Sequence, residues 1–213
     1  MKARLKLIII IAFLLLLLAI SVIAVYRHIS ANNSAESIIL ESTKDIKNAD
    51  TVFYFQSDPQ WYNDPLGDSK FEMDDSGCLT TSLTSALCMQ KIDVEGVEEI
   101  TPKTINKYLS DHNVYDSEGN MQWIPLEEAI NISVTRKTAG EVNSSKIDRL
   151  LKKGIYPIVR VKIKGTVVHY ILITESHDGE YWCMDPANKN KDLVPLSDYD
   201  NRIYALRYIE NKY

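Results

Sequence analysis

Cys78 is the residue of this sequence with the clearest capacity for covalent chemistry. It follows Asp74-Asp75-Ser76-Gly77 and opens a segment of helical periodicity that runs from Leu79 to Met89. A cysteine at a helix N-terminus faces unpaired backbone N–H groups and the positive end of the helix dipole, and both stabilise a thiolate over a thiol. The glycine before it lets the backbone turn tightly. The alternative interpretation is a small, buried core residue, as most free cysteines are.

The other two cysteines are predicted to be core residues. Three cysteines leave at least one thiol unpaired, which excludes a full disulfide framework. Cys88 lies past the first turn of the same helix, among apolar neighbours, and Cys183 lies inside the strand Tyr-Trp-Cys-Met-Asp. No Cys-x-x-Cys pair or Cys/His cluster indicates a metal site, and we expect no cofactor.

A thiol nucleophile needs a base, and His169 is the predicted one. It lies in Val167–Thr174, the most apolar strand of the chain, where burying an unpaired imidazole would be costly. The alternative is a core histidine bonded to a backbone carbonyl. The remaining histidines lie in the N-terminal apolar segment, at a helix end and in a hairpin tip; they are His28, His112 and His177.

Asp185 and Gln56 complete the candidate set. Asp185 ends the strand that follows His169, where its carboxylate can approach the imidazole, hold its tautomer and stabilise the imidazolium. The alternative for Asp185-Pro186 is a plain turn. Gln56 follows a predicted strand at Thr51–Phe55, and its amide suits donation to a developing oxyanion beside the backbone N–H of Cys78. Taken alone, Gln56 is equally a surface glutamine.

The elements that must position these residues are helical in the first half of the domain and extended in the second. After a loop over residues 56–77, helices are predicted over 79–89, from the Thr101-Pro102 cap through Leu109, over 123–130, and from a Ser144 or Ser145 cap to Gly154. Strands are predicted over 156–164, 167–174, 180–184 and 203–208. Helices followed by an antiparallel sheet make an α+β domain.

The N-terminus predicts a membrane segment. In residues 1–28, basic residues precede an uncharged run from Leu7 to Val25, whose nineteen residues span roughly 28 Å as a helix, close to the thickness of a bilayer core. The flanking charges favour a cytoplasmic N-terminus and an extracytoplasmic remainder. The alternative is a signal cleaved after the small-residue pattern ending at Ala24, which would give a secreted protein. Residues 29–50 are then a juxtamembrane stalk, and residues 51–213 are the folded domain.

Charge and composition restrict the partners. The chain is 45% apolar and 25% charged, as a folded protein is. Subtracting the +4 of residues 1–28 from the total of −5 leaves −9 for residues 29–213. An acidic outer domain argues against nucleic acid as a partner, because phosphate binding depends on clustered Lys and Arg.

Four blocks of the sequence, in order, resemble a known family. They are FQSDPQW at 55–61, SGCLTTSL at 76–83, HYILIT at 169–174 and MDPA at 184–187. They resemble the free-standing bacterial relatives of the bacteriocin-processing, double-glycine-leader cysteine peptidases, in the papain-like superfamily. The resemblance implies a papain-like fold in which Cys78 is the nucleophile, His169 the base, Asp185 its orienting group and Gln56 the oxyanion donor.

The sequence differs from the family pattern at Leu79, and it lacks the ATP-binding motif of the family's exporters. Family members commonly carry a small residue after the nucleophile, where this chain has Leu79. There is no Walker A motif, so we do not expect an exporter subunit. The resemblance implies a membrane-anchored, extracytoplasmic cysteine peptidase acting on a peptide or protein. Two alternatives remain: other papain-like acyl chemistry, such as a cell-wall amidase or a transglutaminase-like reaction, and a catalytically silent anchored binding domain.

Overall fold

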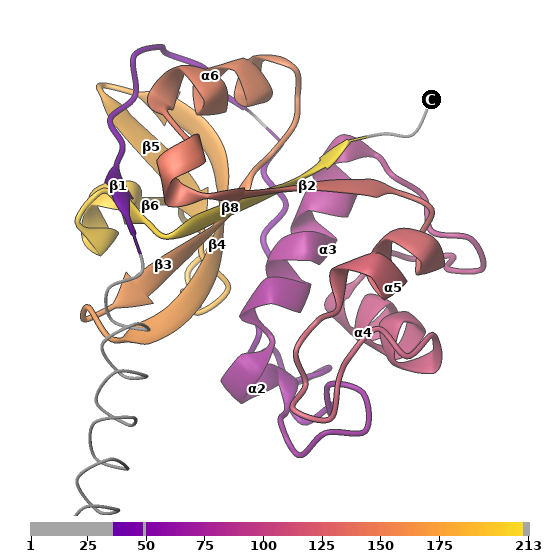
Figure 1. Ribbon diagram of the computed structural model, residues 1–213. Helices are drawn as coiled ribbons and strands as arrows, with labels where there is room; N and C mark the ends of the chain where they lie inside the picture. The colour runs from indigo at the N-terminus through magenta and orange to yellow at the C-terminus, as the bar shows by residue number, and fades with distance from the viewer. Residues whose placement is uncertain (1–35, 49, 211–213) are drawn as a thin grey trace, which may run out of the picture. The chain divides into compact units, whose positions relative to one another are not determined.

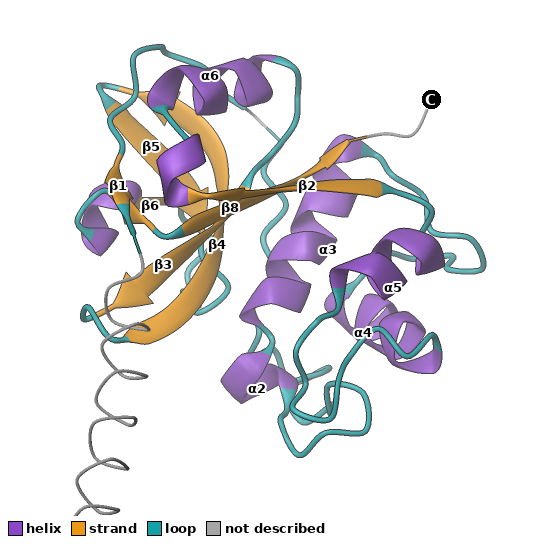
Figure 2. Ribbon diagram, in the orientation of Figure 1, coloured by secondary structure: helices purple, strands orange, loops and turns teal. Residues whose placement is uncertain are grey.

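Helices precede the main strands of the computed structural model, which describes residues 36–48 and 50–210 (Figure 2). The helices are α2 (Met73–Ser76), α3 (Cys78–Gln90), α4 (Pro102–Asp111), α5 (Trp123–Ala129) and α6 (Ser144–Lys152), with 3-10 turns η1 (Ala139–Glu141) and η2 (Leu196–Tyr199). The strands are β1 (Ile38–Ile39), β2 (Ser133–Thr138), β3 (Ile158–Ile163), β4 (Val167–His177), β5 (Glu180–Met184), β6 (Val194–Pro195), β7 (Arg202–Ile203) and β8 (Ala205–Glu210).

Six strands form one antiparallel sheet in the order β2-β8-β3-β4-β5-β6, and β1 pairs with β7 in a second, two-stranded sheet. Helices α2 to α5 lie on one side of the large sheet, and α6 lies on the other (Figure 1). The mixed fold of helices and antiparallel sheet confirms the predicted α+β class. Each face of the sheet therefore has its own layer and its own core.

Strand β4 lies inside the sheet because its side chains serve both cores. Leu172 belongs to the cluster shared with α3, α4 and α5, whereas Ile171 and Ile173 belong to the cluster on the α6 side. This alternation places successive side chains on opposite faces, as in any strand. It also explains why the sequence of β4 reads as an almost unbroken apolar run.

Helix α3 packs closely on this strand because small side chains cover its middle. Every residue from Thr80 to Leu87 is buried, and the Thr84 hydroxyl donates a hydrogen bond to the carbonyl of Thr80. The Ser82 hydroxyl donates to the Tyr170 carbonyl of β4 at 3.3 Å. That contact joins α3, the helix that begins with Cys78, to the residue that directly follows His169.

The helix starts agree closely with the sequence. Thr101 caps α4 through a capping box with Thr104, and Pro102 occupies the first turn. The cap of α6 is Asn143, whose side chain accepts from the backbone of Lys146, and not Ser144 or Ser145 as predicted. Asparagine and serine cap helices about equally well, so the pattern alone does not choose between adjacent positions.

Two strand predictions differ from the structure. Residues 51–55 are not a strand, although they contain β-forming side chains, and the backbone N–H of Gln56 donates instead to the carbonyl of Pro186 at 3.0 Å. Strand β2 was not predicted, because its sequence, Ser-Val-Thr-Arg-Lys-Thr, has polar residues at five of six positions. It is nevertheless an edge strand paired along its length with β8.

The folded unit begins before the predicted boundary at Thr51. It extends from Glu36, because β1 pairs with β7, Leu40 is 1% exposed, and Ile46 exchanges backbone hydrogen bonds with Ser176. Residues 36–48 are thus part of the domain and not of a stalk. Within the described residues no helix is long and apolar enough to span a membrane. The predicted segment of residues 1–28 lies outside them.

Candidate active site

Cys78 is the first residue of α3, as predicted. The preceding Gly77 caps the helix without any side-chain hydrogen bond, so the first-turn N–H groups have no side-chain cap. Gly77 has an ordinary φ of −79°, and a Cβ there would collide with the backbone and sulfur of Met73 in α2. The glycine is therefore required by the close approach of α2 to α3, and not by a tight turn.

His169 is buried and bonded on one side to Asp185. Its Nε2 lies 2.6 Å from Asp185 Oδ1, and Cys78 is the other group whose proximity raises the pKa of the ring. Because Asp185 occupies Nε2, the nitrogen left to face Cys78 is Nδ1. The structure thus brings together the three residues that the sequence proposed from separate elements.

The charge of His169 is set by opposing effects. Burial by itself lowers the pKa of an imidazole, but hydrogen bonds to Asp185 and Cys78, with the negative charges of both, raise the pKa of His169 to about 9. At neutral pH this environment favours the imidazolium. Asp185 therefore keeps the ring oriented from the Nε2 side while the other side of the ring faces Cys78.

Asp185 is fixed by three hydrogen bonds. Its Oδ1 accepts from His169 and from the backbone N–H of Ala187 at 2.8 Å, and its Oδ2 accepts from the Tyr199 hydroxyl at 2.6 Å. Burial raises the pKa of a carboxyl, but here the bonds from His169, Tyr199 and Ala187 outweigh burial and hold the pKa of Asp185 below its usual range. Asp185 therefore stays ionised beside the imidazole.

Tyr199 is a site residue that the sequence did not reveal. It lies in η2, where it reads as one more aromatic residue of a polar turn, and no motif marks it. Its ring centre is 6.4 Å from that of His169, and burial together with Asp185 raises the pKa of its hydroxyl. It remains a neutral donor that covers the far oxygen of Asp185.

Gln56 joins the two halves of the site. Its side-chain Nε2 donates to the carbonyl of Asp74, four residues before Cys78, and its backbone N–H donates to Pro186, the neighbour of Asp185. The Oε1 of Gln56 is buried and has no hydrogen-bond partner among the described residues. An amide nitrogen carries two hydrogens, so one remains beyond the bond to Asp74.

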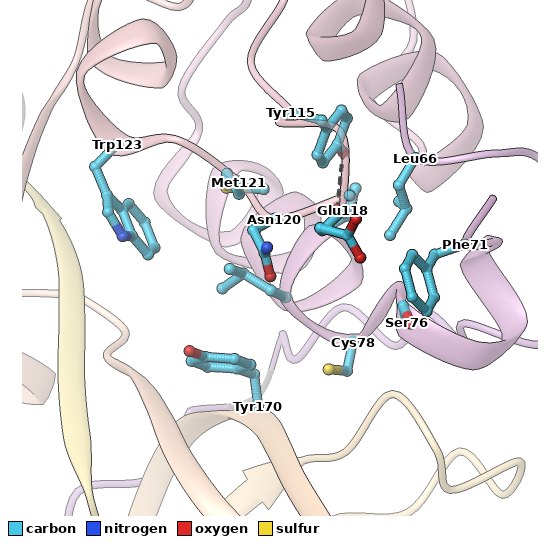
Figure 3. Close-up of a pocket in the computed structure, with 13 residues that line it drawn as sticks. Leu66, Phe71, Ser76, Cys78, Tyr115, Glu118, Asn120, Met121, Trp123 and Tyr170 are labelled. Atoms are coloured by element: carbon cyan, nitrogen blue, oxygen red, sulfur yellow. Dashed lines mark hydrogen bonds between the residues drawn. The ribbon is translucent and has the colours of Figure 1, made fainter. Parts of the chain in front are cut away.

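A pocket of about 640 Å³ opens beside Cys78. Of the four residues predicted for the site, Cys78 is the one that lines it, together with Leu79 and Thr80 from the start of α3. Figure 3 shows Cys78 and Tyr170 on one wall and the loop carrying Glu118 and Asn120 on the facing wall. The complete lining is Leu66, Phe71, Ser76, Cys78, Leu79, Thr80, Tyr115, Glu118, Gly119, Asn120, Met121, Trp123 and Tyr170.

The loop that forms the facing wall of the pocket is bonded to the start of α3. The Tyr115 hydroxyl and the Thr80 hydroxyl are 2.9 Å apart, which fixes the facing loop against the first turn of α3 (Figure 3). Leu79, the residue that departs from the family pattern, forms part of the lining and packs against the core. Leu79 and Cys78 both line the pocket.

The other thiols lie in apolar surroundings. All three cysteines are free. Burial raises the pKa of Cys88, which lies beside Tyr54, and raises that of the fully buried Cys183 well above its ordinary value. Among the described residues, no group of three His, Cys, Asp or Glu side chains is arranged to hold a metal ion.

Comparison with known proteins supports the resemblance at the level of the fold. The sequence matches no protein-family model and no curated protein. Among solved structures, the chain is similar to a candidate C39-like peptidase from Bacillus anthracis, with a TM-score of 0.52 and 10% sequence identity. The similarity covers 80% of this chain and all of the other. The likeness therefore shows a fold similar to that of the C39-like peptidase.

Proposed function

We propose that this domain is a cysteine peptidase that hydrolyses peptide bonds through Cys78, His169 and Asp185. The observation that carries the proposal is the position of one buried imidazole between a cysteine at a helix N-terminus and a carboxylate 2.6 Å away. The papain-like fold expected from the sequence, and the similarity to a C39-like peptidase, agree with this chemistry.

The chemistry follows from the order of the groups. The pKa of His169, about 9, favours the imidazolium at neutral pH, which pairs with a thiolate at Cys78. The sulfur attacks the carbonyl carbon of the substrate, and His169 then donates its proton to the leaving amine. Water then attacks the thioester while the neutral ring takes a proton from it, the acyl–sulfur bond breaks, and the thiolate–imidazolium pair is regenerated. Asp185 holds the ring by its Nε2–H and stabilises its positive charge throughout.

Gln56 and the backbone N–H of Cys78 are the proposed donors to the oxyanion. The bond from Gln56 to Asp74 fixes the amide near the start of α3, and the second Nε2 hydrogen is the one assigned to the developing charge. Such donors act when they are already in place before the reaction begins. The buried, unpartnered Oε1 of Gln56 is consistent with an amide held for its nitrogen.

We further propose that the domain works outside the cytoplasm, attached to the membrane by residues 1–28. The support is the uncharged run Leu7–Val25 with its basic flank. The folded unit begins at Glu36, which leaves about ten residues between the end of this run and the domain. The catalytic domain would then lie close to the membrane surface.

The test is hydrolysis of a fluorogenic peptide library by the full chain. We expect cleavage by the wild type and none by Cys78→Ala, with Cys88→Ala as the matched control that retains activity. Mass spectrometry of the products separates hydrolysis from transfer, because a transferase joins the acyl group to an added amine. Equal products from the wild type and Cys78→Ala would reject the peptidase assignment.

A further inference from the structure

Three arginines form a row on the sheet face that carries Tyr170. Arg136 of β2 is directly opposite Arg207 of β8, and Arg207 is opposite Ile158 of β3. Arg160 is two residues beyond Ile158, so it shares this face and is the diagonal neighbour of Arg207. Arg160 is in turn directly opposite Tyr170 of β4. The strand register therefore places the three arginines in a row across β2, β8 and β3, with Tyr170 of β4 next in line.

The row is short of negative charge. Arg136 faces Glu127 at 3.7 Å, whereas Arg160 and Arg207 form no ion pair within the part of the chain that the structure describes. Arg207 Nη1 donates to the carbonyls of Lys137 and Leu206 at 3.1 and 2.8 Å, but its buried Nε has no partner there. Like charges opposite each other destabilise a sheet, so this arrangement has a cost that an anion would remove.

The pKa values of Arg207 and Tyr170 reflect the closeness of the guanidinium groups. Burial lowers the pKa of the Arg207 guanidinium, and the positive charges of Arg160 and Arg136 lower it further. Burial raises the pKa of the neighbouring Tyr170, while Arg160 and Arg207 oppose that rise. Both effects show that the guanidinium groups concentrate positive potential at one place, next to the Tyr170 hydroxyl.

The row lies beside two residues of the pocket that holds Cys78, although no arginine of the row is part of the lining. The Arg207 guanidinium carbon lies 5.4 Å from the centre of the Trp123 ring, and both Trp123 and Tyr170 line the pocket. Figure 3 shows the Trp123 ring and the Tyr170 hydroxyl at the end of the pocket away from Phe71 and Ser76. The one carboxylate of the lining, Glu118, is on the facing loop and would repel an anion placed beside it.

We propose that the Trp123–Tyr170 end of the pocket binds a carboxylate of the substrate through Arg160 and Arg207. This inference rests on the proposed function and names its substrate class: peptides that carry a carboxylate close to the bond that is cleaved. A guanidinium presents paired N–H donors that match the two oxygens of a carboxylate, and such charged hydrogen bonds are stronger than neutral ones. The carboxylate is either a chain terminus or an acidic side chain.

Alkylation of Cys78 in the full chain tests the inference without a known substrate. The probes are chloroacetylated glycine peptides of one to three residues, each as the free acid and as the amide. The Cys78 sulfur forms a bond to the probe methylene carbon and chloride leaves. Each acid-to-amide ratio of rate constants is divided by the same ratio for a small model thiol. We expect one probe length to give a corrected ratio of about 10 or more, because charged hydrogen bonds contribute about 1.5–3 kcal/mol.

Charge-matched variants identify the source of the preference. Arg160→Gln and Arg207→Gln should each lower the corrected ratio about tenfold, whereas Arg149→Gln, an exposed change on α6, should leave it unaltered. Circular dichroism checks that each variant is folded. If one of the two arginine variants does not fold, the other is enough to test the inference. A corrected ratio near one in the wild type, or a ratio lowered equally by the Arg149 variant, overturns the inference.

Failure of the proposed function gives a different result. If Cys78 reacts no faster than the model thiol with every probe, the peptidase assignment fails. A binding measurement then tests whether the carboxylate site exists. Acetylated glycine acids and amides are titrated into Cys78→Ala while the arginine side-chain NMR signals are followed. Acid-specific shifts that Arg207→Gln abolishes support the site, and equal responses to acid and amide refute it.

The two sources of the carboxylate are distinguished by a second probe pair. Chloroacetyl-Gly-Asp-amide carries its charge on the side chain, and chloroacetyl-Gly-Asn-amide is its neutral match. If the Asp probe shows the arginine-dependent preference, the site takes an acidic side chain. If the preference is confined to free acids of the glycine series, the enzyme acts near a chain terminus.

Discussion

Replacing Asp185 with Asn should lower the pKa of the His169 imidazole. That pKa is about 9, against an ordinary value of 6.5, and the side chain of His169 is 5% exposed, so solvent screens it little. The difference corresponds to about 3 kcal/mol in favour of the imidazolium. Burial lowers the pKa, so Asp185 and Cys78 together must stabilise the imidazolium by more than about 3 kcal/mol. Losing the charge of Asp185 should lower the pKa of His169 by roughly one to two pH units.

The same imidazole makes stability depend on pH in a known direction. Because the folded pKa of His169 lies above the unfolded value, its contribution is fully present below pH 6.5 and is lost as the pH rises through 9. We expect the free energy of unfolding of the wild type to fall between pH 6.5 and 9 by about 3 kcal/mol more than that of His169→Asn. In Asp185→Asn, the fall in the free energy of unfolding should exceed that of His169→Asn by a smaller amount.

Two measurements check this reasoning. NMR titration of the histidine ring carbons, assigned with His169→Asn, gives the pKa of His169 in the wild type and in Asp185→Asn. Urea unfolding at pH 6.5 and 9 gives the three free energies. If His169 titrates near 6.5 in the wild type, or if the Asn variant titrates identically, the charge of Asp185 does not hold the ring and the ion-pair argument is wrong.

Four further predictions concern the other parts of the site and the topology. Haloacetamide at about pH 6 should label Cys78 in the folded chain faster than the partly exposed Cys88, whose pKa is raised, and the buried Cys183 should stay unlabelled; equal labelling of Cys78 and Cys88 in a peptide map would contradict this. Gln56→Ala should lower turnover by about 10²–10³-fold, and unchanged steady-state rates would remove Gln56 from the mechanism. Tyr199→Phe deletes one hydrogen bond that lowers the pKa of Asp185, so the acid limb of the pH–activity profile should move to higher pH; an unmoved limb would limit Tyr199 to a structural role. Protease added to intact cells should digest residues 36–210, and protection until lysis would reverse the predicted orientation.

The sequence predicted the elements whose signals are local. Helix α3 was recognised from its apolar spacing, α4 from the Thr101-Pro102 pair, and β5 from its composition, and all three lie where expected. Residues 51–55 were misassigned because β-propensity reflects fit to a neighbouring strand, and that segment has none. Strand β2 was missed for the converse reason, because its pairing with β8 compensates for its polar sequence.

The site was predictable where each member stands at the end of an element. Cys78 begins a helix, His169 lies near the start of a strand, and Asp185 follows one, so each had a positional signal. Tyr199 had none, because its contact with Asp185 is created where η2 packs against β5, far along the chain from the strand that carries His169. The row of arginines likewise needs the register of four strands, which no single segment specifies.

The site depends on the fit between two layers that the chain builds separately. Cys78 belongs to the helical layer, whereas His169 and Asp185 belong to the sheet, so their spacing is set where the layers meet. Hydrogen bonds that cross this junction near the site include the bond from the Ser82 hydroxyl to the Tyr170 carbonyl and the two that Gln56 donates, to Asp74 and to Pro186. A change at any of these bonds can therefore alter the Cys78–His169 spacing while the elements themselves stay folded. Gln56 therefore has two separable roles. Its side chain bonds the segment before Cys78, and its backbone N–H bonds Pro186, the neighbour of Asp185.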